Sequence, residues 1–336
     1  MTELHDSAII EVRDLVKVYG DETRAVDGIS FGVAPGELFG FLGPNGAGKT
    51  TTIRILATLL QPTEGTARVA GFDVTTHPGE VRKRLGLAQQ APALDAFSTG
   101  RETLELAGIL QRMPLPEVRR RAAELLELMG LTSVGKKLTG TYSGGMKRRI
   151  DLASALMHSP PVLILDEPTE GLDPQSRTAL WEELERINQA GTSMLLTTHY
   201  MEEADRLCSR LAIIDNGRIV VDGSPGELKR SVGGDTVVLR LATTNGDLES
   251  QRATVRRLLA DMVADDAVSP HPEGVSLSVP NASEAVPAML RRLDGEHVAI
   301  TGLQMSQPSL DSVFLKYTGR HIREEAADQP ISMGWQ

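Results

Sequence analysis

Short hydrophobic runs recur along the first two thirds of the chain and predict its strands. Five segments have a strand pattern: residues 9–19, 28–33, 38–42, 162–165 and 194–196. The second alternates apolar residues with smaller or polar ones, which is typical of a half-buried strand. The last two are unbroken apolar runs, as in parallel strands that are buried on both faces. Asn216-Gly217 lies between two further apolar runs and predicts a β-hairpin.

Segments with helical periodicity separate these strands. We predict helices at residues 50–60, in a helical stretch over 101–130, and at 146–157. In the stretch, one face gathers Val118, Ala122, Leu125, Leu126 and Met129. The arginines at 119–121 lie mostly off that face and are interpreted as solvated. Alternating strands and helices predict an α/β fold over residues 9–230, with a helical subdomain at about 91–145.

The composition shifts near Gly223, and Gly233-Gly234 is a candidate linker. Beyond it the pattern predicts strands at 236–241, 274–279 and 298–305 and helices at 251–263, 283–293 and 309–317. These elements indicate a small C-terminal α+β domain over residues 235–320, with a ferredoxin-like arrangement as the candidate. Residues 321–336 are expected to form a flexible tail.

Composition excludes several classes of protein. The 336 residues include 45 acidic and 35 basic ones, for a net charge of −10, which disfavours nucleic acid as a partner. The single cysteine, Cys208, allows no disulfide within the chain and fits a reducing cytoplasm. No segment approaches the roughly 20 apolar residues of a membrane span, and the acidic first seven residues do not resemble a secretory signal. We therefore expect any role in transport to need a second, membrane-crossing polypeptide.

The first chemical motif joins the strand at 38–42 to the helix at 50–60. It reads Gly43-Pro44-Asn45-Gly46-Ala47-Gly48-Lys49-Thr50, followed by Thr51, and matches the phosphate-binding loop. Glycines let backbone N–H groups converge on phosphate, and the helix N-terminus adds its positive dipole. Lys49 is expected to reach the β- and γ-phosphates of ATP, and Thr50 to ligate Mg²⁺. The strand before and the helix after this loop make the match specific.

Two acids end the apolar run at 162–165. Carboxylates there lie at the carboxyl end of a buried strand, where α/β sheets bind ligands. Asp166 is the candidate to hold Mg²⁺ through water, and Glu167 the candidate to polarise the attacking water. A phosphate loop with these acids predicts a P-loop NTPase, a class that includes kinases, GTPases and motors.

A second helix start narrows this class. Ser143-Gly144-Gly145-Met146, preceded by Tyr142, opens the helix at 146–157 and is a second candidate anion site. The segment resembles the signature motif of the ABC (ATP-binding cassette) family. The resemblance implies that two cassettes close head to tail, with Ser143 and the following glycines capping the nucleotide held by the partner. Tyr142 and Met146 depart from the usual leucine and glutamine.

Four further residues match family positions. Tyr19 resembles the aromatic that stacks on adenine, although a core tyrosine is nearly as good an interpretation. Gln90 resembles the glutamine that reaches Mg²⁺ and water, with Gln89 as the alternative. Asp173, in Gly-Leu-Asp-Pro, resembles the D-loop aspartate, and His199 the histidine that contacts the γ-phosphate. The resemblance covers residues 9–223 in the family's order and spacing.

The C-terminal segments 308–315 and 318–320 resemble the tail of daunorubicin-exporter-type ATPases. Together the resemblances imply an ATP hydrolase that takes Mg²⁺, forms a homodimer, and works at the cytoplasmic face of the membrane with an integral membrane permease. Export of drugs, antibiotics or lipids is the favoured hypothesis. An importer ATPase and a soluble ABC ATPase that acts on ribosomes or DNA are the alternatives.

Overall fold

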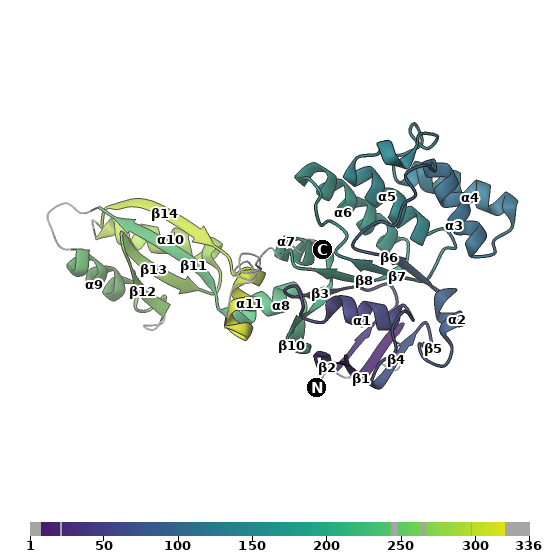
Figure 1. Ribbon diagram of the computed structural model, residues 1–336. Coiled ribbons are helices and arrows are strands. Elements are labelled where there is room, and N and C mark those ends of the chain that lie inside the picture. The colour runs from purple at the N-terminus through teal and green to yellow at the C-terminus, as the bar shows by residue number, and fades with distance from the viewer. Residues whose placement is uncertain (1–7, 21, 243–247, 264–266, 297, 320–336) are drawn as a thin grey trace, which may run out of the picture. The chain divides into compact units, whose positions relative to one another are not determined.

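The computed structural model describes residues 8–319 apart from 21, 243–247, 264–266 and 297 (Figure 1). The chain divides into two compact units between Pro225 and Gly226, close to the boundary expected at 230–235. The predicted tail at 321–336 and the first seven residues lie outside the described residues. Within the described part, no helix has the length and apolar character that a bilayer span requires.

A six-stranded sheet forms the centre of the first unit. Its order is β10 (Arg218–Gly223), β9 (Arg210–Asp215), β3 (Leu38–Leu42), β8 (Ser193–Thr198), β7 (Val162–Asp166) and β6 (Leu85–Ala88). Neighbours are parallel except β9 and β10, which pair as the predicted hairpin. The strands β3, β7 and β8 are buried at every position, which confirms the interpretation of their apolar runs.

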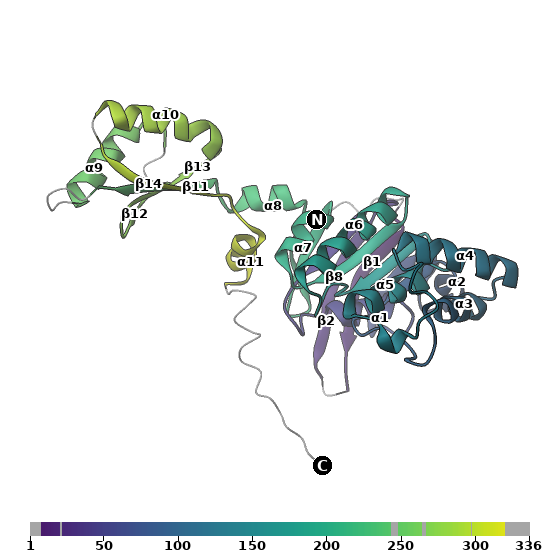
Figure 2. The ribbon, with the colours of Figure 1, turned by 90° about the horizontal axis from the view of Figure 1, so that it is seen from above.

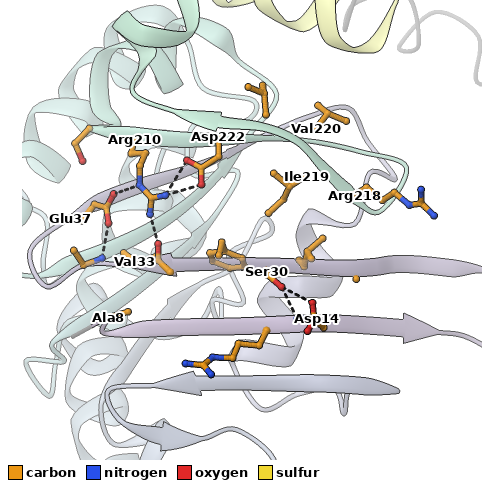
Figure 3. Close-up of a pocket in the computed structure, with 18 of the residues that line it drawn as sticks. Ala8, Asp14, Ser30, Val33, Glu37, Arg210, Arg218, Ile219, Val220 and Asp222 are labelled. Carbon is orange, nitrogen blue, oxygen red and sulfur yellow. Dashed lines mark hydrogen bonds and ion pairs between the residues drawn. The ribbon is translucent and has the colours of Figure 1, made fainter. Parts of the chain in front are cut away.

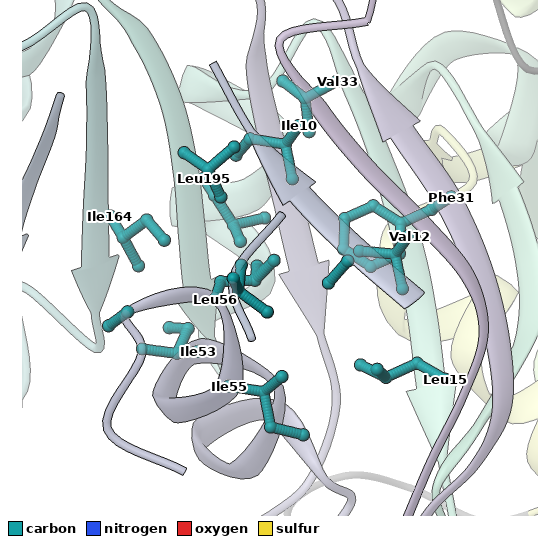
Figure 4. Close-up of a cluster of buried hydrophobic side chains, with 14 of the residues drawn as sticks. Ile10, Val12, Leu15, Phe31, Val33, Ile53, Ile55, Leu56, Ile164 and Leu195 are labelled. Atoms are coloured by element: carbon teal, nitrogen blue, oxygen red, sulfur yellow. The ribbon is translucent and has the colours of Figure 1, made fainter. Parts of the chain in front are cut away.

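A four-stranded antiparallel sheet packs beside it, in the order β2 (Arg24–Val33), β1 (Ile10–Val18), β4 (Glu64–Val69) and β5 (Phe72–Asp73). Between the two sheets lies α1 (Lys49–Leu56), which buries Ile53, Ile55 and Leu56 in their common core (Figure 4). The predicted helix at 50–60 was too long. It stops at Ala57 because Thr58 takes a left-handed φ of 62°, and the amides of residues 59 and 60 turn back to the Arg54 carbonyl.

The predicted helical stretch is a pair of helices, α3 (Gly100–Leu110) and α4 (Leu115–Leu128), which pack with α5 (Gly144–Ala155). Thr99 and Glu102 form a capping box at the start of α3. The predicted apolar face of α4 is buried. The remaining elements of this unit are α2 (Pro78–Arg82), a short 3-10 turn (Thr139–Thr141), α6 (Pro174–Gln189) and α7 (Met201–Leu207).

The second unit begins within α8 (Pro225–Val232). It continues as β11 (Asp235–Leu241), α9 (Leu248–Leu259), β12 (Val268–His271), β13 (Gly274–Val279), α10 (Ala282–Gly295), β14 (Ile300–Ser306) and α11 (Leu310–Thr318). The sheet order is β12-β13-β11-β14, all antiparallel, and α9 and α10 cover one face (Figure 2). A βαββαβ chain in this strand order is ferredoxin-like, as expected.

Candidate nucleotide site

The loop after β3 is shaped by close backbone packing. Gly43 has no room for a side chain, because an added Cβ would lie 2.3 Å from the Ile214 carbonyl oxygen. Gly48 has φ of 105°, and a Cβ there would lie 2.4 Å from the Ala25 carbonyl oxygen. The β9–β10 turn also contacts the loop, since Gly217 N–H donates to the Ala47 carbonyl at 3.0 Å. Two distant segments, the strand β2 and the β9–β10 hairpin, therefore fix the curvature of residues 43–48.

The helix that follows presents its first amides to a ligand. Gly48 is the N-cap of α1 and provides no side-chain cap, so the first-turn amides have no capping oxygen. Asn45 and Gly46 are exposed at the tip of the loop, and Thr50 and Thr51 are half-buried on the first turn. Such a helix start favours an anion, and it fits the phosphate chain of ATP.

Lys49 lies under this loop. Its ammonium is buried and donates to the carbonyl oxygens of Gly43 at 2.7 Å and Pro44 at 2.9 Å. It also lies 3.2 Å from a carboxylate oxygen of Glu167. Burial lowers the pKa of Lys49, and the negative charge of Glu167 opposes that effect. The cation is therefore held at the place where phosphate oxygens would approach.

Asp166 meets two threonine hydroxyls at the end of β7. Thr197 Oγ1 donates to Asp166 Oδ1 at 2.6 Å, and Thr50 Oγ1 donates to the same oxygen at 3.3 Å. Hydroxyl and carboxylate oxygens suit Mg²⁺, which usually takes one or two protein ligands and completes its shell with water and phosphate. The pair Thr50 and Asp166 fits that pattern. Within the described residues no cluster of three or more His, Cys, Asp or Glu side chains offers a competing metal site.

Glu167 follows Asp166 in an unusual backbone conformation. Its φ is 46°, a left-handed value that is rare outside glycine, and its N–H donates to the Thr197 carbonyl at 3.1 Å. One carboxylate oxygen faces Lys49, and the other lies 3.2 Å from His199 Nδ1. Burial raises the pKa of Glu167, but hydrogen bonding to His199 and the charge of Lys49 outweigh it and hold the pKa below its ordinary value. The carboxylate is therefore ionised at neutral pH and able to accept a proton from water.

The second helix start, residues 143–146, is also an ordinary capped helix. Ser143 Oγ accepts a hydrogen bond from the Met146 amide at 3.3 Å, and Ser143 and Gly144 are exposed. Gly145 packs against the start of α6, where an added Cβ would lie 2.8 Å from Ser176 Oγ. Tyr142 is buried, and its hydroxyl donates to the Val134 carbonyl at 2.7 Å.

The remaining predicted residues lie on nearby loops. Asp173 caps α6 by accepting from the Ser176 amide at 2.9 Å. Hydrogen bonds from the Ser176 side chain and backbone lower the pKa of Asp173. Gln90 Nε2 donates to Glu170 at 2.6 Å, so its side chain reaches the segment that follows Glu167. Gln89 contributes a backbone carbonyl instead. Tyr19 is 38% exposed at the end of β1, with the Lys17 ammonium 5.6 Å from its ring centre.

Two buried polar groups beside the site escaped sequence reasoning. Arg148 on α5 donates to the carbonyls of Asp166 and Pro168, on either side of Glu167. Glu203 on α7 accepts from Thr169 at 2.8 Å and from the Trp181 ring nitrogen at 3.0 Å, and burial raises its pKa. Arginine and glutamate are common on helix surfaces, so only the tertiary structure distinguishes these two. Cys208 is buried and burial raises its pKa, so the thiol is unreactive.

A separate cavity of about 1230 Å³ lies between β2 and the β9–β10 hairpin (Figure 3). None of the phosphate-loop residues lines it. Arg210 spans its wall and pairs with Glu37 at 2.9 Å and with Asp222 at 2.8 Å (Figure 3). Arg210 is therefore already paired with two carboxylates of this chain, and size alone does not make the cavity the nucleotide site.

Family models match both units. A model described as "ABC transporter" matches residues 26–170. A second, described as "ATP-binding protein DrrA1-3-like, C-terminal domain", matches residues 223–318. A third, described as "AAA domain, putative AbiEii toxin, Type IV TA system", matches only residues 138–205 and omits the phosphate loop.

Known proteins resemble the chain over nearly its whole length. The daunorubicin/doxorubicin resistance ATP-binding protein DrrA of Streptomyces peucetius is 44% identical, over 95% of this chain and 96% of that protein. Nod factor export ATP-binding protein I of Ralstonia nicotianae is 40% identical, over 94% of this chain and 95% of that protein. A dimeric, post-hydrolysis ATP-binding cassette bound to ADP and phosphate is 25% identical, with a TM-score of 0.59, over 64% of this chain and 98% of that one.

Proposed function

We infer the function from one premise: the chain belongs to the family of ABC transporter ATP-binding proteins of the DrrA type. It is the ATP-hydrolysing subunit of an ABC exporter. The observation that carries the assignment of its residues is the contact network of Lys49, Glu167 and His199 beneath the phosphate loop. A kinase of the same class would need a site for an acceptor substrate, and no residue of this network supplies one.

In the proposed mechanism, Glu167 accepts a proton from the water that attacks the γ-phosphorus, while the bond from that phosphorus to the β–γ bridging oxygen breaks and ADP leaves. His199 holds the carboxylate from the side opposite Lys49, and the strained backbone of Glu167 directs it to that position. Lys49 stabilises the charge that builds on the phosphate oxygens. Bound Mg²⁺, held by Thr50 and Asp166, would neutralise charge on the phosphates during transfer.

The signature helix acts in the partner subunit's site. ATP-binding subunits of this family dimerise and work with membrane permeases. Ser143 and Gly144 are exposed at the start of α5, Gly145 is buried next to them, and helix-start amides favour anions. We propose that these residues cap the partner's γ-phosphate. Asp173, beside Ser176, would lie at the same dimer interface, and Gln90 would transmit the state of the nucleotide through Glu170 to the helical region.

We propose that the exporter moves a drug, antibiotic or lipid-like molecule, and that this subunit works at the cytoplasmic face of the membrane. The proposal follows the resistance and export functions in the names of the relatives. The second unit supports it, because its residues match a model that takes its description from the DrrA proteins.

A capture experiment tests the function. Tagged Glu167→Gln protein is added with MgATP to detergent-solubilised native membranes and recovered by its tag. Slow hydrolysis should trap the closed dimer and retain a stoichiometric integral-membrane protein. Lys49→Ala is the matched control, because loss of the phosphate-loop cation should prevent both ATP binding and capture. Recovery of ribosomes or nucleic acid instead would contradict the exporter assignment. Rapid ATP turnover by Glu167→Gln would show that Glu167 is not the proton acceptor.

A further inference from the structure

Arg148 is a buried cation in the middle of the cassette. It lies on α5, five residues after Ser143, and its side chain is 5% exposed. Burial lowers the pKa of the guanidinium, and the nearby carboxylates of Asp151 and Asp166 oppose that effect. A buried arginine is costly unless its N–H groups find acceptors. The identity of those acceptors therefore indicates what Arg148 does.

Two of the acceptors bracket Glu167. Arg148 Nε donates to the Pro168 carbonyl at 2.7 Å, and Nη2 donates to the Asp166 carbonyl at 2.9 Å. These carbonyls belong to the residues immediately before and after Glu167, whose φ of 46° is left-handed. A left-handed φ in a residue with a side chain persists only when its surroundings hold it. Arg148 provides that restraint from one side, and Thr197 provides it from the other.

The third nitrogen reaches a different loop. Arg148 Nη1 donates to the carbonyl of Gln89, the residue before Gln90, and lies 3.3 Å from a carboxylate oxygen of Asp151 one turn along α5. One planar guanidinium therefore joins the signature helix, the backbone of Glu167 and the loop that carries Gln90. The compact ammonium of lysine lacks this planar fork and cannot reproduce its geometry.

We propose that Arg148 is a positioning residue that holds the backbone of Glu167 in its reactive conformation and couples it to α5 and to the Gln89–Gln90 loop. This inference rests on the proposed function of Glu167. It implies that movement of the signature helix, when the partner's nucleotide is engaged, is transmitted to the chain's own glutamate. Arg148 itself touches neither nucleotide nor water in this scheme.

The test compares the steady-state ATPase rates of Arg148→Lys, Arg148→Ala and wild type. We expect kcat to fall by about 30-fold or more in both variants, while KM for ATP changes by less than about threefold, because the phosphate loop is intact. Free guanidinium should partly restore kcat in Arg148→Ala by occupying the space of the lost group. Arg149→Lys is the matched control: Arg149 is the next residue on the same helix, but it donates to the Met129 carbonyl at 3.2 Å, away from Glu167.

A double-mutant cycle distinguishes positioning from general stabilisation. If Arg148 acts through Glu167, Arg148→Ala should reduce the residual rate of a Glu167→Ala protein by less than about twofold. A full additional loss would overturn the proposal, as would a normal kcat for Arg148→Lys in folded protein. Wild-type hydrolysis that is abolished by Glu167→Gln tests the proposed function separately, so the two ideas fail on different results.

Discussion

At the scale of single residues, the site depends on hydroxyls and carbonyls that orient a few charges. Thr197 is the clearest case, because its hydroxyl donates to Asp166 and also accepts from the Glu167 amide at 3.1 Å. It is buried at the end of β8, where water cannot replace these contacts. The two adjacent acids thus depend on a neighbouring strand for their orientation.

Thr197→Val should lower kcat by roughly tenfold or more, because an isosteric methyl group removes the shorter of the two hydrogen bonds that the buried Asp166 carboxylate accepts from threonine hydroxyls. Steady-state ATPase measurements on wild type and variant test this. Thr178→Val is the control, since that exposed hydroxyl only bonds back to the Pro174 carbonyl on its own helix. Equal effects of the two substitutions would contradict the special role of Thr197.

Asp151 should make stability depend on pH. Burial raises its pKa from 3.8 to about 6, although Arg148 opposes the change. Between those values the folded state holds the proton more tightly than the unfolded state, so this residue's contribution to the free energy of unfolding falls as pH rises through that window. The loss amounts to about 1–3 kcal/mol and is complete above about pH 6.

Asp151→Asn removes this titration. Urea unfolding at about pH 4.5 and pH 7 should show a smaller decrease in stability with rising pH for the variant than for wild type. Because the substitution removes the carboxylate that pairs with Arg148, it should destabilise the variant at both pH values. The test is therefore the change in the free energy of unfolding between the two pH values. Parallel slopes would mean that Asp151 is ionised throughout.

At the scale of elements, the starts of α5 and α6 fit together closely. Gly145 on α5 leaves no space for a methyl group beside Ser176 on α6, whereas a Cβ on Gly144 would make an ordinary contact at 3.8 Å with Leu172. The two adjacent glycines of the signature segment, Gly144 and Gly145, therefore differ in their tolerance to a side chain.

Gly145→Ala should destabilise the protein by about 1–3 kcal/mol through overpacking of these two helices. Gly144→Ala is the matched control and should change stability by less than about 0.5 kcal/mol. Denaturant unfolding of both variants measures the difference. Equal stabilities would show that the two helices separate at little cost.

The same scale shows what could be predicted from the sequence. Strands β3, β7 and β8 were identified because burial on both faces leaves an unbroken apolar run. The strands β4 and β12 were missed, since Glu64–Val69 is exposed at four of its six positions and Val268–His271 contains a proline. Both are held by their neighbours in the sheet, which local patterns do not report.

The residues of the candidate site likewise fall into those that the sequence predicts and those that it does not. The motifs that contact nucleotide in the proposed mechanism could be identified, because phosphate chemistry requires particular residue types at a fixed spacing. Arg148 could not, since most of its partners are backbone carbonyls of residues 89, 166 and 168. A carbonyl is present at every position, so such a partner leaves no pattern in the sequence.

At the scale of the whole molecule, the two units have separate hydrophobic clusters. One gathers residues of the cassette sheets and α1, and the other gathers β11–β13 strands with α9 and α10. Leu277 is fully buried in the second cluster. Since ATP is proposed to bind only the first unit, ligand and core substitutions should affect different unfolding transitions.

Leu277→Ala should destabilise the second unit by about 2–5 kcal/mol. MgATP should raise the melting temperature of the first unit and leave that of the second unit unchanged. Differential scanning calorimetry of wild type and variant, with and without MgATP, separates these effects. Val286→Ala, a second truncation in the same cluster, should shift the same transition. A single transition that responds to both changes would show that the units unfold together.

The order of strands in the central sheet bears on synthesis of the chain. β3, which leads into the phosphate loop, pairs with β8 and β9, and those strands end about 155 and 175 residues later in the sequence. A nascent chain on the ribosome therefore exposes the apolar segment Leu38–Leu42 without β8 until Thr198 has emerged, and without β9 until Asp215 has emerged. Translation at about 5–20 residues per second makes this an interval of roughly ten seconds or more, during which the segment is a natural client for chaperones.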